Sequence, residues 1–169
     1  MIYEVLSEIS ELLNQYFKMR FGIAEDKLII SNLVNNDGTE AVERDRVVLS
    51  LVGLQEEKML YNRVPSTSNP PVSLYLYILF STTFYGNMAS EGLKFISEII
   101  GFFQADNVFE LEGNKVIFEI HNLDFGMQNN LWASIGAKYT PSVLYKAAMV
   151  TIDESMPPAS LSVSTDFPE

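Results

Sequence analysis

Helical periodicity marks the start of the chain. Apolar side chains within residues 2–17 recur at intervals of three and four, which places them on one face of a helix. They are Ile2, Val5, Leu6, Ile9, Leu12, Leu13, Tyr16 and Phe17. Glu4, Glu8 and Glu11 fall on the opposite face. The pattern predicts an amphipathic surface helix whose apolar stripe packs on a sheet.

Strand patterns follow. Residues 28–33 form a short apolar run, and residues 35–38 (Asn-Asn-Asp-Gly) are a strong turn signal. Residues 46–55 are mostly apolar on both faces, so we expect a central strand there rather than an edge strand. Residues 73–84 are rich in aromatic and β-branched side chains. Their alternation predicts one face with Leu74, Leu76, Ile78 and Phe80, and another with Tyr75, Tyr77, Leu79 and Ser81.

A second helix is predicted over residues 88–103, with Asn87 as its N-cap. Its apolar residues cover more than one face, which indicates burial between a sheet and a further surface such as a neighbouring subunit. Residues 108–111 and 115–120 flank a Glu-Gly-Asn turn and predict a hairpin.

The last elements are a short helix and a strand. The helix is expected to start after Asp124 and to end at Gly136, a good residue for a helix C-terminus. The strand is expected over residues 143–152. Together these elements predict an α+β fold, with a mixed, largely antiparallel sheet packed against two long helices and one short helix.

The domain organisation follows from composition. We expect a single domain over residues 1–153 and a flexible, acidic tail rich in Pro and Ser over residues 154–169, which has too little apolar surface to order itself. Residues 65–71 (PSTSNPP) read as a loop. The length of 169 residues suits one domain with a substantial core.

Composition excludes several chemistries. The chain has no Cys and one His, which rules out disulfides, thiolate metal sites, cysteine catalysis and multi-His zinc sites. The formal net charge of −11 argues against nucleic acid and anionic membrane surfaces as partners. No N-terminal targeting signal is visible, and the longest nearly apolar stretch, residues 72–85, is shorter than the roughly 20 residues of a membrane helix. We therefore expect synthesis in the cytoplasm without membrane insertion.

Candidate chemistry is sparse. His121 with Asp124 could form an acid/base pair, but no nucleophile motif accompanies it, and a hydrogen-bonded residue at a strand end is the simpler interpretation. The acidic cluster Asp37, Glu40, Glu43 and Asp45 lacks the spacing of a calcium loop. No glycine-rich phosphate loop occurs. We expect no cofactor and no bound metal, and a binding or structural protein rather than an enzyme.

An ordered set of features runs through nearly the whole chain. It comprises Met1-Ile2, Val5-Leu6 and Leu12-Leu13-Asn14, then Pro70-Pro71 before the strand, then Leu93, Ile96, Ile99, Ile100 and Phe103-Gln104 in the second helix, and finally Leu131-Trp132, Tyr139, Pro141-Ser142, Tyr145 and Val150 to Asp153. This set resembles the cap, or tail-terminator, family of phage-tail-like contractile injection systems. The antifeeding prophage and the Photorhabdus virulence cassette carry members of that family.

The resemblance implies a structural role. A member would form a ring, by analogy a hexamer, on the distal end of the inner tube and sheath, where it ends polymerisation. It would be made in the cytoplasm and travel in a particle that is released or anchored to a membrane. Two alternatives stay open: a small-molecule-binding α+β domain or enzyme that uses His121, and another adaptor or baseplate component of the same machinery.

The resemblance also selects candidate residues. Pro70, Pro71, Trp132, Tyr139, Pro141 and Tyr145 match the family pattern and are candidates for contact with partners. Each has a structural alternative: Trp132 would anchor the short helix to the sheet, and Pro141 would fix the turn into the last strand. The acidic loop Asp37 to Asp45 and the tail are further candidates for an interface.

Overall fold

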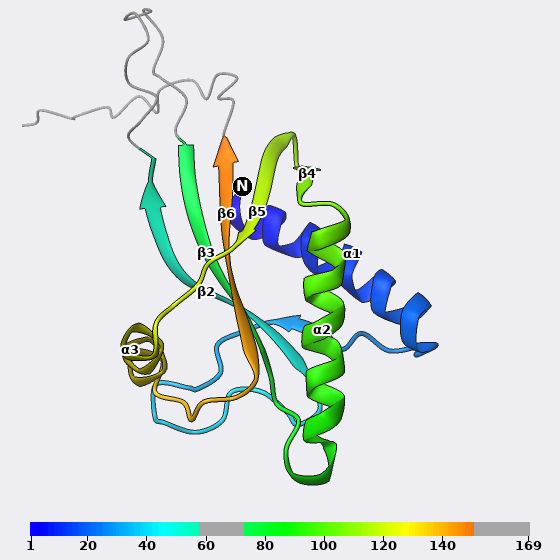
Figure 1. Cartoon of the computed structure of the whole chain (residues 1–169), viewed down its shortest axis with the longest axis vertical. Coiled ribbons are helices and arrows are strands. Elements are labelled where there is room, and N and C mark those ends of the chain that lie inside the picture. Colours follow the sequence, from blue (N-terminus) through cyan, green and yellow to red (C-terminus); the bar gives the residue numbers. More distant parts are fainter. Residues whose placement is uncertain (58–72, 151–169) are drawn as a thin grey trace, which may run out of the picture.

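The computed structural model describes residues 1–57 and 73–150 of the chain. Figure 1 shows the arrangement of its elements. The helices are α1 (Ile2–Phe21), the short 3-10 helix η2 (Gly86–Met88), α2 (Ala89–Ala105) and α3 (Phe125–Ile135). The strands are β1 (Leu28–Ile30), β2 (Val47–Glu56), β3 (Ser73–Thr82), β4 (Val108–Leu111), β5 (Asn114–Ile120) and β6 (Ser142–Val150).

The strands form one sheet in the order β1-β2-β3-β6-β5-β4. The pair β1–β2 is parallel, and the other pairs are antiparallel. The β4–β5 hairpin turns at Glu112 and Gly113, which both have positive φ. The predicted α+β class and the largely antiparallel sheet are therefore confirmed.

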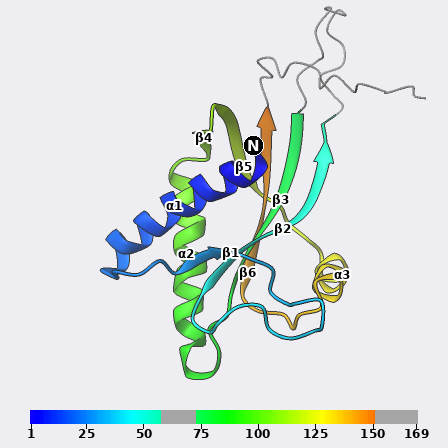
Figure 2. The same cartoon turned by 180° about the vertical axis from the view of Figure 1, so that it is seen from behind.

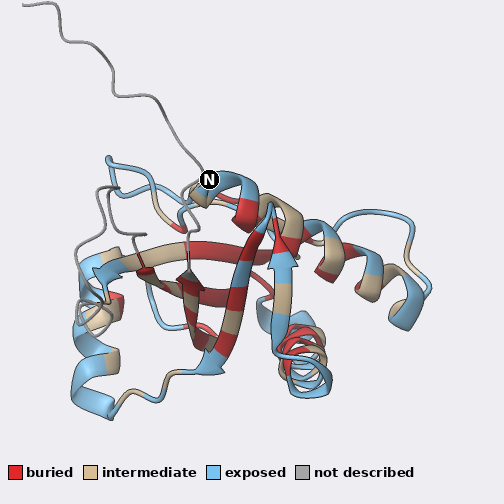
Figure 3. Cartoon of the chain, turned by 90° about the horizontal axis from the view of Figure 1, so that it is seen from above, coloured by how far each residue is buried: buried red, intermediate tan, exposed pale blue. Residues whose placement is uncertain are grey.

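The sheet separates the helices into two layers. Helices α1 and α2 cover one face, and α3 lies on the other, near the lower end of the sheet in the view of Figure 1 (Figures 1 and 2). Seen from above, buried residues concentrate in the strands and on the sides of the helices that face them (Figure 3). We call the two sides of the sheet the α1/α2 face and the α3 face.

The alternation predicted for β3 is confirmed. Leu76, Ile78 and Phe80 pack on the α1/α2 face, whereas Leu79 and Tyr77 belong to the cluster on the α3 face. The core of the α1/α2 face is strongly aromatic. Phe103 of α2 stacks on Phe118 of β5, with the ring centroids 4.6 Å apart. Burial of such rings makes a large favourable contribution to the free energy of folding.

Two polar arrangements attach α1 to the rest of the fold. The buried Asn14 side chain donates to the carbonyl of Leu28 at 2.9 Å and accepts from the backbone N–H groups of Lys27 and Leu28. This fixes the start of β1 against the helix. On the outer side, Tyr16 donates to the Glu98 carboxylate at 2.7 Å, and Arg20 donates to the same group, which joins α1 to α2.

Two predictions about element ends need correction. Asn87 is not the N-cap of the second helix, because Gly86, with φ of 60°, starts a 3-10 turn and α2 begins only at Ala89. Its cap residue is Met88, without a side-chain hydrogen bond. The strand β2 has a neighbour on both sides only at its start, because β1 pairs with Val47 to Leu49 and no other described strand pairs with the outer edge from Leu51 to Gln55.

The broad apolar surface of α2 is only partly covered. Phe95, Ile96, Ile99 and Phe103 are buried, but Leu93 is 54% exposed. Helix α1 supplies part of the second cover expected for this helix, because the rings of Tyr16 and Phe17 contact those of Phe102 and Phe95. The loop of residues 65–71, the end of the last predicted strand and the tail lie outside those residues. Within the described part of the chain, no helix combines the length and apolar character needed to cross a membrane.

Candidate functional site

The short helix α3 forms because each of its ends has a defined stop. At its start, the Asp124 carboxylate accepts a hydrogen bond from the Met127 N–H at 2.7 Å, which is N-capping. At its end, Gly136 adopts the left-handed conformation, with φ of 77°, as its position predicts. The chain then turns back through Tyr139 and Pro141 into β6.

Trp132 attaches α3 to the sheet. It is 5% exposed and belongs to a cluster with Leu33, Val48, Leu79 and Leu144. This confirms that Trp132 anchors the helix. On its other side, the Trp132 ring contacts the Tyr139 ring in a T-shaped arrangement, with the ring centroids 5.5 Å apart. Tyr139 itself is 60% exposed.

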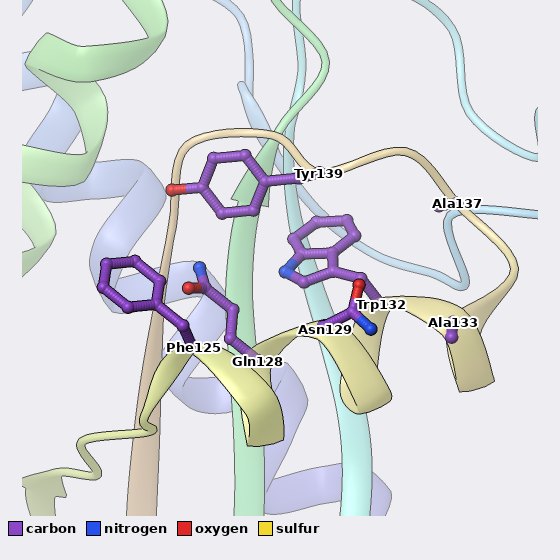
Figure 4. A pocket seen from close by; sticks show the side chains of 7 residues that line it. All are labelled: Phe125, Gln128, Asn129, Trp132, Ala133, Ala137 and Tyr139. Atoms are coloured by element: carbon purple, nitrogen blue, oxygen red, sulfur yellow. The ribbon is translucent and has the colours of Figure 1, made fainter.

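A groove opens beside this pair of rings. Its volume is about 360 Å³, and it is lined by Phe125, Gln128, Asn129, Trp132, Ala133, Ala137 and Tyr139. Figure 4 shows the indole nitrogen of Trp132 facing into the space between Gln128 and Tyr139. We call this space the α3 groove. Its walls are aromatic, and its polar groups are an indole N–H, two side-chain amides and a phenol.

The outer surface of α3 is uncharged. Residues 125–137 contain no Asp, Glu, Lys or Arg, although the whole chain carries a net charge of −11. Two apolar side chains stand in solvent there: Phe125 is 91% exposed and Met127 is 58% exposed. Aromatic and Met side chains are enriched at protein interfaces, and charged residues are depleted from their centres. The surface of α3 therefore has the composition of a protein contact site.

The remaining candidate residues have different positions. Tyr145 is 2% exposed and packs against Phe103 and Phe80 on the α1/α2 face, where burial raises the pKa of its phenol to about 12. It acts in the core. Pro141 precedes β6 and is half-buried. Pro70 and Pro71 lie outside the described residues.

The acidic loop is a folded turn rather than a cluster of converging carboxylates. Asp37 accepts hydrogen bonds from the hydroxyl and the N–H of Thr39, which hold the pKa of its carboxyl below the ordinary value of 3.8. Val42 is 9% exposed and ties the loop to the α3 face. Within residues 1–57 and 73–150, no group of three or more His, Asp or Glu side chains could hold a metal ion.

The structure does not favour an acid/base pair of His121 and Asp124. Asp124 is engaged as the cap of α3, and it does not line the small hollow of about 160 Å³ that His121 borders. The His121 ring instead lies edge-on to Tyr77, with centroids 5.1 Å apart. The structure thus supports the simpler interpretation of a histidine at a strand end.

The sequence predictions missed Phe125, Gln128 and Asn129 in this site. A usable signal was present, because residues 125–137 contain no charged side chain although the chain as a whole is strongly acidic. The exposure of Phe125 could not be deduced in advance, since it depends on which face of α3 packs on the sheet.

Two solved structures share this fold. One is described as the sheath/tube terminator, in the extended state, of an extracellular contractile injection system named PVC. It has a TM-score of 0.63 and 13% identity, and the match covers 100% of this chain and 64% of that chain. The other is the tube-terminating cap of the anti-feeding prophage, with a TM-score of 0.52 and 15% identity over 92% of this chain and 60% of that chain.

The present chain therefore spans less than two thirds of the length of either terminator. No curated protein matches it in a sequence search. A family model, the Pvc16 N-terminal domain, matches residues 4–165, which include every described strand and all but the first two residues of α1. The match covers nearly the whole chain, and the chain belongs to the Pvc16 N-terminal domain family.

Proposed function

We propose that the protein is the cap, or terminator, of a contractile injection system. It would sit on the distal end of the inner tube and sheath and stop their polymerisation. The observation that carries this proposal is the family match over residues 4–165, together with a fold shared with two tube terminators. The role is structural, and we propose no catalytic activity, cofactor or metal.

A terminator needs two surfaces with different properties. One must fit the last ring of a repeating assembly, and the other must not accept a further ring. Two features of the fold suit this role. Among the described residues, no strand pairs with the outer edge of β2 from Leu51 to Gln55, so this stretch could pair with a strand from a tube or sheath subunit. The uncharged surface of α3 lies on a different side of the sheet from the two long helices (Figures 1 and 2).

We further propose that copies of the chain form a ring, by analogy with six members, and that assembly takes place in the cytoplasm before the particle is released or anchored. The net charge of −11 makes copies of the chain repel one another, whereas the uncharged residues 125–137 allow a close approach.

The test is particle length. A strain that lacks this chain should assemble tubes and sheaths of irregular length in electron micrographs, and expression of the chain in trans should restore a uniform length. Normal and contractile particles of uniform length in the deletion strain would contradict the proposal. As a control for the alternative that uses His121, the variant His121→Ala should restore uniform length as well as the unmodified chain does.

A further inference from the structure

The α3 groove has the chemistry of a site for an extended, proline-containing peptide. Such peptides adopt the polyproline II conformation and bind grooves lined by aromatic rings. Trp132 and Tyr139 supply two rings at 5.5 Å in a T-shaped pair, and Phe125 supplies a third on the other side of the groove. The rings are held by α3 and by the turn into β6, so they are in place before a ligand arrives.

A hydrogen-bond donor inside the groove has no partner. The Trp132 side chain is nine-tenths buried, yet its indole nitrogen faces into the groove, and no described residue accepts a hydrogen bond from it (Figure 4). Indole N–H is only a donor, and a proline-containing backbone offers carbonyl acceptors without competing N–H groups. The Trp132 indole N–H therefore needs an acceptor, and a backbone carbonyl of a bound peptide of this type would provide one.

The chain itself contains two proline pairs outside the described residues, Pro70-Pro71 and Pro157-Pro158. The charge around the groove favours the second. At one end of the groove, the exposed side chain of Lys138, next to Tyr139, carries a positive charge. At the other end, the Asp124 carboxylate accepts the hydrogen bond from the Met127 N–H. The segment that contains Pro157 has four acidic residues and no basic residue, namely Asp153, Glu154, Asp166 and Glu169. The segment that contains Pro70 has Lys58 and Arg63 and no acidic residue.

Chain length decides which copy supplies the segment. β6 has 9 residues, so its ends lie roughly 27 Å apart. The groove is next to the start of β6, and the chain leaves at the far end, Val150 (Figure 1). Pro157 follows Val150 by seven residues, which span at most about 25 Å. A chain that must first reverse its direction cannot cover that distance, whereas the groove of an adjacent copy poses no such constraint.

We propose that the α3 groove of each copy binds the Pro157-Pro158 segment of a neighbouring copy. Pro157 or Pro158 packs in the groove beside the paired rings of Trp132 and Tyr139 and opposite Phe125, and a backbone carbonyl of the segment accepts a hydrogen bond from the Trp132 indole. The inference requires that copies associate, but it does not depend on their role at the end of a tube. It can therefore fail or succeed independently of the proposed function.

Trp132 is the single tryptophan of the chain, so its fluorescence reports on the groove directly. The full-length protein is titrated over concentration while Trp emission and sedimentation are recorded. We expect emission to move to shorter wavelength as copies associate, because the bound segment excludes water from the indole. The double variant Pro157→Ser/Pro158→Ser should lose this change and associate at least about tenfold more weakly, a difference of about 1.4 kcal/mol. The matched control Pro168→Ser should behave like the unmodified chain.

A mixing experiment shows whether the segment comes from the same copy or from a neighbouring copy. A Trp132→Phe chain keeps its own segment but gives no tryptophan signal, and the double proline variant keeps Trp132 but lacks the segment. Only their mixture should show the emission change if the segment comes from a neighbour. Three outcomes would overturn the proposal: an unaltered response of the double variant, a response that does not depend on concentration, or loss of the response in Pro70→Ser/Pro71→Ser instead.

Discussion

The two faces of the sheet carry similar types of residue, but those residues are buried to different extents. On the α1/α2 face, aromatic rings stack on one another in a continuous buried cluster, as Phe103 does with Phe118 and Tyr145. On the α3 face, a smaller cluster around Trp132 leaves aromatic side chains in solvent, among them Phe125 and Tyr139. The same side-chain chemistry therefore stabilises the fold on one face and is available for binding on the other.

Two phenylalanines give the sharpest contrast. Phe103 on α2 is 3% exposed, and Phe125 on α3 is 91% exposed. Both residues lie on helices that pack on the sheet, so the difference in their exposure comes from the side of the helix on which each ring lies. The following substitutions are ordered from the largest expected effect on the free energy of unfolding to the smallest.

Phe103→Ala should have the largest effect. Removal of this ring leaves a cavity between α2, β3, β5 and β6, where it contacts Phe80, Phe118 and Tyr145. We expect a loss of about 3–5 kcal/mol in the free energy of unfolding, measured by urea denaturation monitored by circular dichroism. A loss below about 1 kcal/mol would show that the aromatic cluster is not the main source of stability.

Asn14→Ala should have the next largest effect, because it removes the partner of three backbone groups at the start of β1. The carbonyl of Leu28 and the N–H groups of Lys27 and Leu28 would lose their hydrogen bonds in a buried site. We expect a loss of about 2–3 kcal/mol, measured in the same way. Gln15→Ala, an exposed neighbour on the same helix, is the control and should change stability by less than about 0.5 kcal/mol.

Glu98→Gln should have a smaller and pH-dependent effect. The hydrogen bond from Tyr16, and then the contact with Arg20, hold the pKa of Glu98 below its ordinary value of 4.5. The ionised form is thus favoured in the folded state, so its contribution is full at neutral pH and is lost as the pH falls through 4.5 and below.

We expect Glu98→Gln to be less stable than the unmodified chain by about 0.5–1 kcal/mol at pH 7, and equal to it in acid. Parallel urea titrations across this pH range measure the difference. A difference that persists unchanged in acid would mean that the carboxylate charge is not what joins α1 to α2. Glu91→Gln, which alters an exposed pair with Lys94 on the same helix, serves as the reference.

Phe125→Ala should leave stability almost unchanged, within about 0.5 kcal/mol, because the ring is in solvent. It should nevertheless weaken association between copies, since the ring lines the α3 groove. Urea denaturation and sedimentation together check both expectations. A marked loss of stability would show that Phe125 belongs to the core, and an unaltered association would show that it takes no part in the contact between copies.

Much of the fold could be predicted from the sequence because local signals agree with tertiary packing. The period of apolar residues located α1, the alternation within β3 assigned its side chains to two faces, and Asp124 with Gly136 bounded α3. The start of α2 was wrong because Gly86 permits a backbone turn that propensity alone does not reveal. That β1 pairs with only the first three residues of β2 also could not be foreseen, since it results from the short length of β1.

The site was less accessible to sequence reasoning. Trp132 and Tyr139 were selected together, and the structure brings their rings into contact. Tyr145, the fourth residue of β6, points to the opposite face of the sheet from Leu144 because side chains alternate along the strand. The groove itself arises from the meeting of one helix with one turn, and no local pattern specifies how far apart the rings at its walls will lie.

The most direct test of the terminator role is the position of the chain in assembled particles. Electron microscopy of particles that carry a labelled copy of this chain would show that position. The account predicts label at one end of each particle only, on the end opposite the baseplate. Label along the length of the sheath, or at the baseplate end, would contradict it and would favour another adaptor role in the same machinery.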